Sequence, residues 1–206
     1  MRRVSIPISA EVIRSLKAGD SVGLNGLMVT GRDAVHKWLY ETFIHPVHQP
    51  TEQDLDVYNA IKPLLAEGVI YHCGPVVLGG GNEPYRFAAA GPTTSIREEP
   101  YQAAVMRHFN LRGVIGKGGM GQATLAACAE IPAAYFHAVG GAAALLADAV
   151  RRVIGVYKME FGVPEAMWVI EVEDFPVVVT MDCHGRDLHR EIEQQSYQSL
   201  RRIIDS

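Results

Sequence analysis

Three cationic side chains stand in glycine- and threonine-rich turns, each where the chain passes from a predicted strand into a predicted helix. Arg32 follows a Thr-Gly pair, Arg97 closes the run Gly91–Ile96, and Lys117 lies inside the turn Gly116–Gly121. In α/β proteins such turns gather at the carboxyl ends of strands, where ligands bind. Two guanidinium groups and an ammonium, with hydroxyls beside them, suit a small dianion such as a dicarboxylate. The alternative for each cation is an ordinary position on a solvated helix face.

The run that ends at Arg97 contains two neighbouring hydroxyls, Thr93 and Thr94. One interpretation is helix capping, a common use of Ser and Thr. The other is proton transfer to or from a ligand. A hydroxyl is a weak base unless neighbouring cations stabilise its alkoxide, and Arg97 and Lys117 are the candidates for that role.

The turn Gly116–Gly121 matches the G-x-G-x-x-G pattern of dinucleotide sites and follows a strand-like segment. That fingerprint also needs an acidic residue at the end of the next strand, and the predicted strand 133–138 ends without one. The segment Gly26–Gly31 has the span of a phosphate-binding loop but is followed by Arg-Asp instead of Lys-Ser or Lys-Thr. What remains is an anion-friendly turn at a helix N-terminus, with Lys117 beside it.

The other titratable side chains give weaker signals. His36 lies four residues after Arg32, on the same predicted helix face, and either positions that arginine, touches the ligand or is structural. His45 and His48 have a metal-like spacing, but no Cys or acid is close. The remaining candidates read as isolated carboxylates, turn residues or buried thiols: Asp20, Asp33, Asp174, the run Asp182–Gly185, Cys73, Cys128 and Cys183.

Composition limits the class of protein. The chain has 206 residues, of which 48% are hydrophobic and 20% charged, so it can bury a core and is not disordered. The net charge of −4 disfavours a nucleic-acid binder. Three Cys without a C-x-x-C pair are typical of a reducing compartment, which predicts a cytoplasmic location. The most apolar run, Ala138–Ala147, is about half of what spans a bilayer, so we expect no membrane segment.

Strand-like and helix-like segments alternate along the chain, which predicts an α/β fold. We find no linker and expect one domain over 1–206, with a C-terminal helix at about 186–203. The strands are predicted at 4–8, 21–30, 69–73, 85–90, 113–115, 133–138, 168–172 and 177–181. The helices are predicted at 10–17, 32–43, 54–66, 100–110, 122–129 and 142–154. Residues 44–51 are expected to form a loop, and the glycine-rich segment 74–84 is expected to be irregular.

Six short motifs occur in an order that resembles one known family. They are Thr30-Gly31-Arg32-Asp33-x-x-His36, Gly74-Pro75, Gly91-Pro92-Thr93-Thr94-Ser95-x-Arg97, Ile115-Gly116-Lys117-Gly118, Gly140-Gly141-x-Ala143 and Val172-Glu173-Asp174-Phe175-Pro176. From about Val4 to Leu188 the chain resembles the β subunit, or C-terminal domain, of iron–sulfur class I fumarases and L(+)-tartrate dehydratases.

The resemblance implies a fold and a reaction. The fold is a swivelling β/β/α domain, and the reaction is the reversible addition of water to, or its loss from, a four-carbon dicarboxylate. In that family a 4Fe–4S cluster with one open iron binds the substrate hydroxyl, and its three cysteines belong to an α subunit. The resemblance therefore implies an α subunit as partner, in an α2β2-type heteromer, no metal ligand in this chain, and no activity without the partner.

The resemblance also assigns roles to individual residues. Thr93 is implied as the base that takes the proton from carbon, with Arg97 and Lys117 as cations for the substrate carboxylate and the alkoxide. Arg32 is implied as a second carboxylate clamp. Further residues are implied to line the substrate or to support these contacts: Thr94, Gly116, Gly118, Asp33 and His36.

The chain departs from the family pattern in ways that bear on the substrate. Many fumarases have Gly-Arg-Met-Asp after the Thr-Thr-Ser run, whereas this chain has Ile96–Glu99. A bulky residue before the arginine, and the run Asp182–Gly185, are closer to tartrate dehydratases. The segment Ile44–Asp56 looks like an insertion and is predicted to line the cleft.

Two other hypotheses compete with the hydro-lyase. One is a stand-alone module that binds small anions without catalysis. The other is a nucleotide-dependent oxidoreductase, which the missing acid after the strand 133–138 disfavours. Within the hydro-lyase hypothesis, conversion of L-tartrate to oxaloacetate stays open beside fumarate and L-malate.

Overall fold

A mixed sheet forms the centre of the fold, which is known from a computed structural model that describes residues 1–205. Its seven strands lie in the order β1-β2-β3-β6-β7-β9-β8. Their bounds are β1 (Arg2–Ile6), β2 (Ser21–Thr30), β3 (Val69–Tyr71), β6 (Gly113–Gly116), β7 (Ala134–His137), β8 (Val150–Tyr157) and β9 (Met167–Met181). The neighbours among β1, β2, β3, β6 and β7 pair in parallel, so their carboxyl ends point the same way.

The long strand β9 closes this sheet on itself. It runs antiparallel to β2, with Met28 opposite Ile170, and its last residues pair with β7, where Phe136 lies opposite Val179. Strand β8 pairs with β9 on the other side, so that Val153 also lies opposite Ile170. Because β2 and β7 are joined through β9, the parallel strands curve round a common centre and their loops converge.

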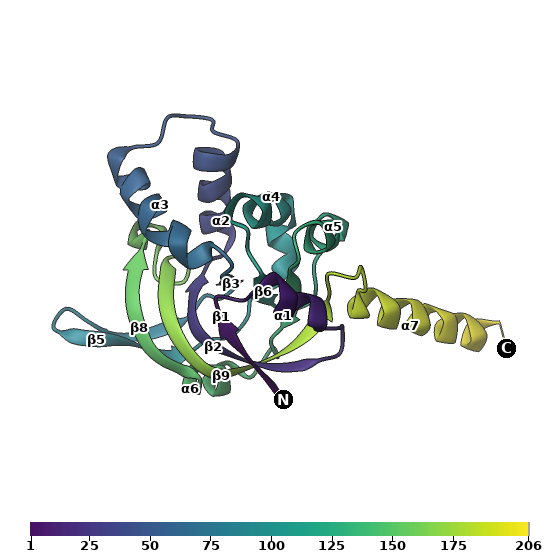
Figure 1. Cartoon of the computed structure of the whole chain (residues 1–206). Coiled ribbons are helices and arrows are strands. Elements are labelled where there is room, and N and C mark those ends of the chain that lie inside the picture. Colours follow the sequence, from purple (N-terminus) through teal and green to yellow (C-terminus); the bar gives the residue numbers. More distant parts are fainter. Residues whose placement is uncertain (206) are drawn as a thin grey trace.

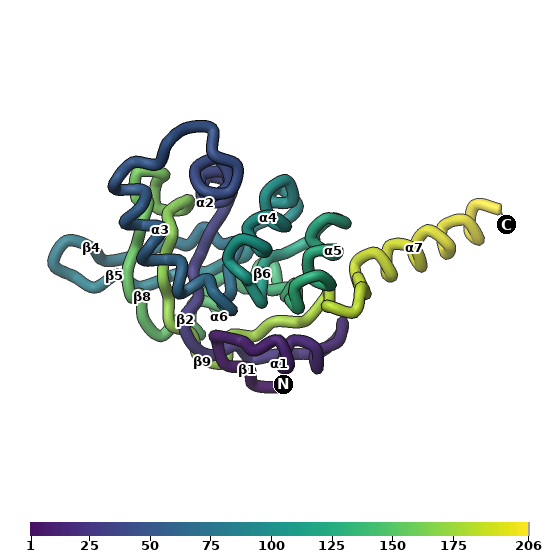
Figure 2. The backbone as a smooth tube through the Cα atoms, turned by 45° about the horizontal axis from the view of Figure 1, so that its top comes forward, coloured from purple at the N-terminus to yellow at the C-terminus, as the bar shows by residue number. Residues whose placement is uncertain are grey.

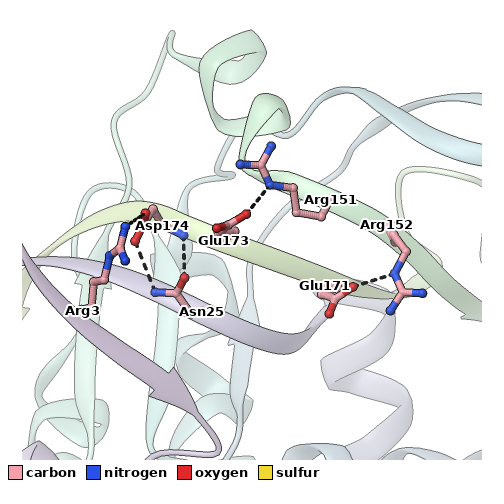
Figure 3. Close-up of polar contacts among 7 residues, drawn as sticks. All are labelled: Arg3, Asn25, Arg151, Arg152, Glu171, Glu173 and Asp174. Atoms are coloured by element: carbon pink, nitrogen blue, oxygen red, sulfur yellow. Dashed lines mark hydrogen bonds and ion pairs between the residues drawn. The ribbon is translucent and has the colours of Figure 1, made fainter.

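A bend in β2 and β9 is fixed by Asp174. This residue has φ 51°, and the β2–β9 register shifts between Leu24 and Gly26. Asn25 Oδ1 accepts from the backbone N–H of Asp174 at 2.9 Å, and Arg3 Nη2 donates to the Asp174 carboxylate at 2.6 Å (Figure 3). A bulge of this kind increases the local twist that closure requires.

Two more ion pairs lie on the same surface, between β8 and β9 (Figure 3). Arg151 Nε lies 2.8 Å from Glu173, and Arg152 Nε lies 2.6 Å from Glu171. All four side chains are largely exposed, so each pair contributes about 0–1 kcal/mol to stability. These pairs favour one register of the edge strand more than they stabilise the fold.

Helices and a hairpin cover the two faces of the sheet (Figures 1 and 2). One apolar core lies under α2 (Asp33–Leu39), the π-helical turn η1 (Tyr40–Ile44), α3 (Glu52–Leu65), α4 (Glu99–Phe109) and α5 (Gln122–Glu130). The other core lies under α1 (Ala10–Ser15), α6 (Ala143–Asp148) and the hairpin of β4 (Val76–Gly80) and β5 (Glu83–Ala89). The last helix, α7 (Leu188–Ile204), projects from the body; two 3-10 turns, η2 (Ser95–Glu98) and η3 (Met159–Phe161), complete the elements.

The α/β class is confirmed, and most predicted elements are present with small changes of boundary. Three predictions are wrong. Residues 76–80 form a strand, because the glycine-rich segment folds back as a hairpin with β5. The helix predicted over 142–154 ends at Asp148, and the β-branched run after it forms β8. The strands predicted at 168–172 and 177–181 are one continuous strand, β9.

No helix among residues 1–205 is long and apolar enough to cross a bilayer.

We expect Ile170→Ala to lower the free energy of unfolding by about 2–5 kcal/mol, because this side chain is fully buried where β9 lies between β2 and β8. The matched control is Ile154→Ala on β8, whose side chain is 48% exposed, and the loss there should stay below about 1 kcal/mol. Urea denaturation of both variants measures the difference. Equal small losses would contradict the central position of β9.

Candidate functional site

The candidate site lies where the carboxyl ends of β2, β3 and β6 meet. A short segment before η2 is inserted between β3 and β6: Thr93 donates its N–H to the His72 carbonyl at 2.7 Å, and Lys117 donates its N–H to the Thr93 carbonyl at 3.2 Å. Ser95 in turn donates to the Lys117 carbonyl at 3.1 Å. These main-chain bonds bring Thr93, Arg97 and Lys117, as predicted, to one place.

Arg97 binds the hydroxyl of Thr93 directly. Its Nη2 donates to Thr93 Oγ1 at 2.6 Å and lies 3.6 Å from Asp33 Oδ1. Both Arg97 and Asp33 are nearly half exposed, so a ligand can reach them. A hydrogen bond from a cation stabilises negative charge on the oxygen that accepts it. Thr94 points to solvent, whereas the next residue, Ser95, is fully buried.

Arg32 is held by a residue that the sequence did not indicate. Its Nε lies 3.1 Å from Glu165 Oε1, and the other carboxylate oxygen of Glu165 accepts from Ala34 N at 3.2 Å. Gly74 of the Gly-Pro motif lies against the Arg32 guanidinium, where a Cβ would collide with Nη1. Arg32 is therefore held by Glu165, which lies between η3 and β9, and a side chain at residue 74 would displace the Arg32 guanidinium.

Lys117 has no ion pair among residues 1–205. Its side chain passes Gly140, where a Cβ would lie 3.4 Å from Lys117 Cδ. Gly116 is buried and has no room for a side chain, because a Cβ there would collide with Ser95 Oγ. Gly118, in contrast, is exposed and faces open space. The ammonium is therefore free for an anion.

Two neighbouring carboxyl groups, those of Asp33 and Glu98, lie beside Arg97. Glu98 is fully buried; burial first, and the neighbouring Asp33 second, raise the pKa of Glu98 to about 8. Burial also opposes ionisation of Asp33, but the neighbouring Glu98 and the charges of Arg97 and Arg32 outweigh it and lower the Asp33 pKa. Glu98 therefore holds a proton at neutral pH, and Asp33 is the anion that faces the arginines.

His36 supports the site and does not face a ligand. It is fully buried, its Nδ1 lies 3.0 Å from the Arg32 carbonyl, and its Nε2 lies 3.0 Å from the Gln102 side chain. The same Gln102 oxygen lies 2.8 Å from His72 Nε2, and His72 Nδ1 lies 2.8 Å from Ser95 Oγ. This buried network ties the turn of Arg32 to the segment of Thr93.

The network fixes the orientation of the Gln102 amide. Burial lowers the pKa of both His36 and His72, so both rings are neutral and each has one donor and one acceptor. His36 donates to the Arg32 carbonyl through Nδ1, so its Nε2 must accept. An acceptor cannot bond to the Gln102 oxygen that faces it, so the amide group must be turned by 180°. The Gln102 NH2 group then faces both rings and donates to them, whereas in the other orientation this nitrogen has no partner.

The anion-binding turn predicted at the N-terminus of α5 is already filled. The Glu99 carboxylate accepts from Gly121 N at 2.8 Å, from Ala123 N at 3.0 Å and from Thr124 N at 3.1 Å. Thr124 Oγ1 adds a fourth bond, at 2.6 Å. The prediction of an open anion turn is wrong there, because a side chain from α4 caps the helix. A phosphate at this helix would therefore have to displace the Glu99 carboxylate from the N–H groups of Gly121, Ala123 and Thr124.

The cysteines and the remaining histidines do not form a metal centre. Cys73 and Cys128 are buried, and burial raises the pKa of each thiol to about 12. Within residues 1–205, no three side chains of His, Cys, Asp or Glu are arranged to hold a metal ion. His45 packs against the Tyr40 ring. These residues do not fit the ligand set of an iron–sulfur cluster.

Asp20, Asp182 and the segment 44–56 make hydrogen bonds that stabilise turns and helix ends. Asp20 accepts from Lys17 N at 2.9 Å. Asp182 accepts from the backbone N–H groups of Ala18, His184 and Arg186, as expected for a turn. In the segment 44–56, Thr51 and Asp54 form a capping box for α3, and Asp54 accepts from Trp38 Nε1 at 2.8 Å.

Comparisons with known proteins show the family of this chain. A family model described as Fumarase C-terminus matches residues 1–192. A putative fumarate hydratase class I of Geobacillus stearothermophilus is 49% identical over 94% of this chain, which spans only 34% of that relative. A putative L(+)-tartrate dehydratase subunit beta of Methanocaldococcus jannaschii is 35% identical over 93% of both chains. The L(+)-tartrate dehydratase subunit beta of Escherichia coli is 33% identical over 90% of this chain and 85% of its own length.

These matches define a domain of the fumarase and tartrate dehydratase type. This domain carries cations in its strand-end turns and a threonine hydroxyl bound by an arginine. The chain belongs to the Fumarase C-terminus family.

Removing the α5 cap tests the reassigned glycine turn. We expect Glu99→Ala to lower the free energy of unfolding by about 1–3 kcal/mol, because four donors lose their acceptor. The control Glu173→Ala breaks only an exposed ion pair and should cost less than about 1 kcal/mol. Chemical denaturation measures both, and an unaffected Glu99→Ala variant would show that α5 does not depend on this carboxylate.

The buried proton on Glu98 makes stability depend on pH. Its folded-state pKa of about 8 lies above the ordinary 4.5, so between these values the folded chain binds more protons than the unfolded chain. The contribution of Glu98 to the free energy of unfolding therefore falls as the pH rises from about 5 to about 8, by about 1.4 kcal/mol for each unit of pH. Glu98→Gln does not titrate, so its stability relative to the wild type should increase over this range. A difference that is constant with pH would contradict the protonated Glu98.

Proposed function

We propose that this chain is the β subunit of a 4Fe–4S-dependent hydro-lyase that adds water to, or removes it from, a four-carbon dicarboxylate. Relatives named for fumarate hydratase and tartrate dehydratase support the reaction class. The proposed partner is an α subunit that carries the three cluster cysteines, in an α2β2-type assembly. Two buried thiols and one partly buried thiol support a reducing, cytoplasmic location.

The contact between Arg97 and Thr93 carries the proposal. In the direction of dehydration, a C–H bond next to a substrate carboxylate breaks, its proton moves to Thr93 Oγ1, and hydroxide leaves the neighbouring carbon. Thr93 must enter this step as an alkoxide, and the guanidinium 2.6 Å from its oxygen stabilises that charge. The ionised Asp33 keeps Arg97 in place.

The other cations bind and orient the substrate. In this proposal Arg32, which is paired with Glu165, clamps one carboxylate, and Lys117 binds the second carboxylate and the charge that builds on it. Thr94, Gly116 and Gly118 line the same turns. The cluster of the α subunit supplies a Lewis acid at the substrate hydroxyl.

Fumarate and L-malate are the first proposed substrate pair, and L-tartrate with oxaloacetate is the second. The relative named for fumarate hydratase is 49% identical, against 35% and 33% for those named for tartrate dehydratase. The two relatives named for tartrate dehydratase are themselves named β subunits, which supports a separate partner chain. Anaerobic assay of the αβ complex with each diacid separates the two pairs.

Substitution of Lys117 tests the site. Lys117→Ala in the reconstituted complex should abolish turnover, a loss of at least about 100-fold in kcat, while subunit assembly and the cluster spectrum stay unchanged. The control Lys37→Ala removes an exposed lysine of α2 and should leave kcat unchanged. Normal turnover of Lys117→Ala would refute the site assignment.

The role of the hydroxyl has its own test. Thr93→Ser keeps the oxygen that Arg97 binds, whereas Thr93→Val keeps the shape and removes it. We expect Thr93→Val to lose about 100- to 10,000-fold in kcat and Thr93→Ser to retain most activity. If the isolated chain binds malate tightly and no partner confers turnover, the non-catalytic anion-binding module replaces the hydro-lyase.

A further inference from the structure

The main-chain ladder between β2 and β3 ends just before the candidate site. Its last pair is Thr30 with Tyr71, and one further backbone N–H of the β2 chain donates to the Tyr71 carbonyl at 2.9 Å. Beyond this point the two chains continue to Arg32 on one side and to His72 on the other. The sheet alone therefore does not fix the separation between the turn of Arg32 and the segment of Thr93.

The side chain of Gln102 connects the two chains beyond the ladder. It is fully buried on α4, and its amide lies 3.0 Å from His36 Nε2 and 2.8 Å from His72 Nε2. His36 Nδ1 donates to the Arg32 carbonyl at 3.0 Å, while the His72 carbonyl accepts from Thr93 N at 2.7 Å. One buried amide therefore joins the backbone of the proposed carboxylate clamp to that of the proposed base.

The protons of this network follow from one another. Burial lowers the pKa of both rings, so each is neutral and has one N–H. Because Gln102 donates to Nε2 of each ring, His36 and His72 both carry their proton on Nδ1. His72 Nδ1 then donates to Ser95 Oγ at 2.8 Å, and Tyr135 donates to the same oxygen at 2.9 Å. A nucleophilic serine needs a histidine nitrogen that accepts its proton, so this tautomer excludes Ser95 as a nucleophile.

We propose that Gln102 is a positioning residue, which fixes the separation between Arg32 and Thr93 through two histidines held as Nδ1–H tautomers. This role rests on the proposed function, in which Arg32 holds a substrate carboxylate while Thr93 takes a proton from carbon. A displacement of about 1 Å between such groups can cost about 100-fold in rate. Gln102 acts through other residues, so its loss should lower kcat more than it raises KM.

The tautomers test the network in the whole chain, without substrate or partner subunit. With 15N-labelled histidine, long-range 1H–15N spectra at neutral pH should show His36 and His72 as neutral rings with the proton on Nδ1. The variants His36→Gln and His72→Gln each remove one set of signals and so assign the spectrum. A proton on Nε2 of either ring in the wild type would overturn the proposal, because Gln102 could not then donate to both.

Turnover of the αβ complex tests the positioning role. Gln102→Met keeps the length of the side chain and removes both donors. For the diacid that the wild type converts, we expect kcat to fall about 10- to 100-fold and KM to change less than about threefold. The matched control is Phe109→Leu, which loses packing at the other end of α4 and should keep the kcat of the wild type. An equal loss of kcat in both variants would show a merely structural role.

A second variant keeps the test decisive if Gln102→Met does not fold. Gln102→Glu has nearly the same shape, but its carboxyl group cannot donate to both rings. At least one of His36 and His72 should then be protonated on Nε2, and kcat should fall by a similar factor. Unchanged tautomers with unchanged kcat would overturn the proposal.

Failure of this role and failure of the proposed function give different results. If the wild-type complex converts no four-carbon diacid, the proposed function fails and the positioning role fails with it, although both rings still carry their proton on Nδ1. If the wild type is active and Gln102→Met is equally active, only the positioning role is refuted.

Discussion

Two main-chain hydrogen bonds of Thr93 hold the candidate site together. One joins it to His72 at the end of β3 and the other to Lys117 at the end of β6. Without this inserted segment, the two strand ends would carry unpaired backbone groups, and Arg97 and Lys117 would belong to unconnected loops. Arg97 and Lys117 therefore lie close together because main-chain hydrogen bonds join the segments that carry them.

The same arrangement explains how three like charges are held close together. Two arginines and a lysine at one place would repel one another without nearby anions. The Asp33 carboxylate and Glu165 compensate the arginines, while Glu98 stays neutral and adds no excess negative charge. Of these three cations, Lys117 alone has no ion pair within residues 1–205, so the site holds one unpaired cation and two that are already oriented. On the proposed function, orientation before binding lowers the entropy cost of holding a flexible substrate.

The sequence predicted the parts of the fold that depend on local signals. The helix α1 and the parallel strands follow their apolar patterns, and α3 begins two residues earlier than predicted, because the capping box at Thr51 lies in the segment that was expected to be a loop. Strand β8 was missed because the alanine-rich run before it has helical character, and only pairing with β9 reveals the strand. The continuity of β9 was missed because Asp174 and Pro176 resemble a turn, whereas Arg3 and Asn25, distant in sequence, hold that bend within a strand.

For the candidate site, too, the sequence indicated the residues with local signals and missed those that contact them from distant parts of the chain. The cations stood out because turn residues surround them, but their supports come from elsewhere in the chain. Glu165, Gln102 and Glu98 carry no motif, and their roles arise only from three-dimensional contacts. The turn Gly116–Gly121 was predicted to bind an anion because of its glycines. The glycines instead allow close packing: Gly116 lies against Ser95, and Gly121 lies against the Glu99 carboxylate.

The cap on α5 has a consequence for selectivity. Phosphorylated metabolites are abundant dianions, and an open helix N-terminus beside Lys117 would attract them. Glu99 fills that position with the protein's own negative charge, and its carboxylate accepts the N–H groups that an external anion would otherwise bind. On the proposed function, the selectivity against phosphate esters would then come from a carboxylate of the chain itself.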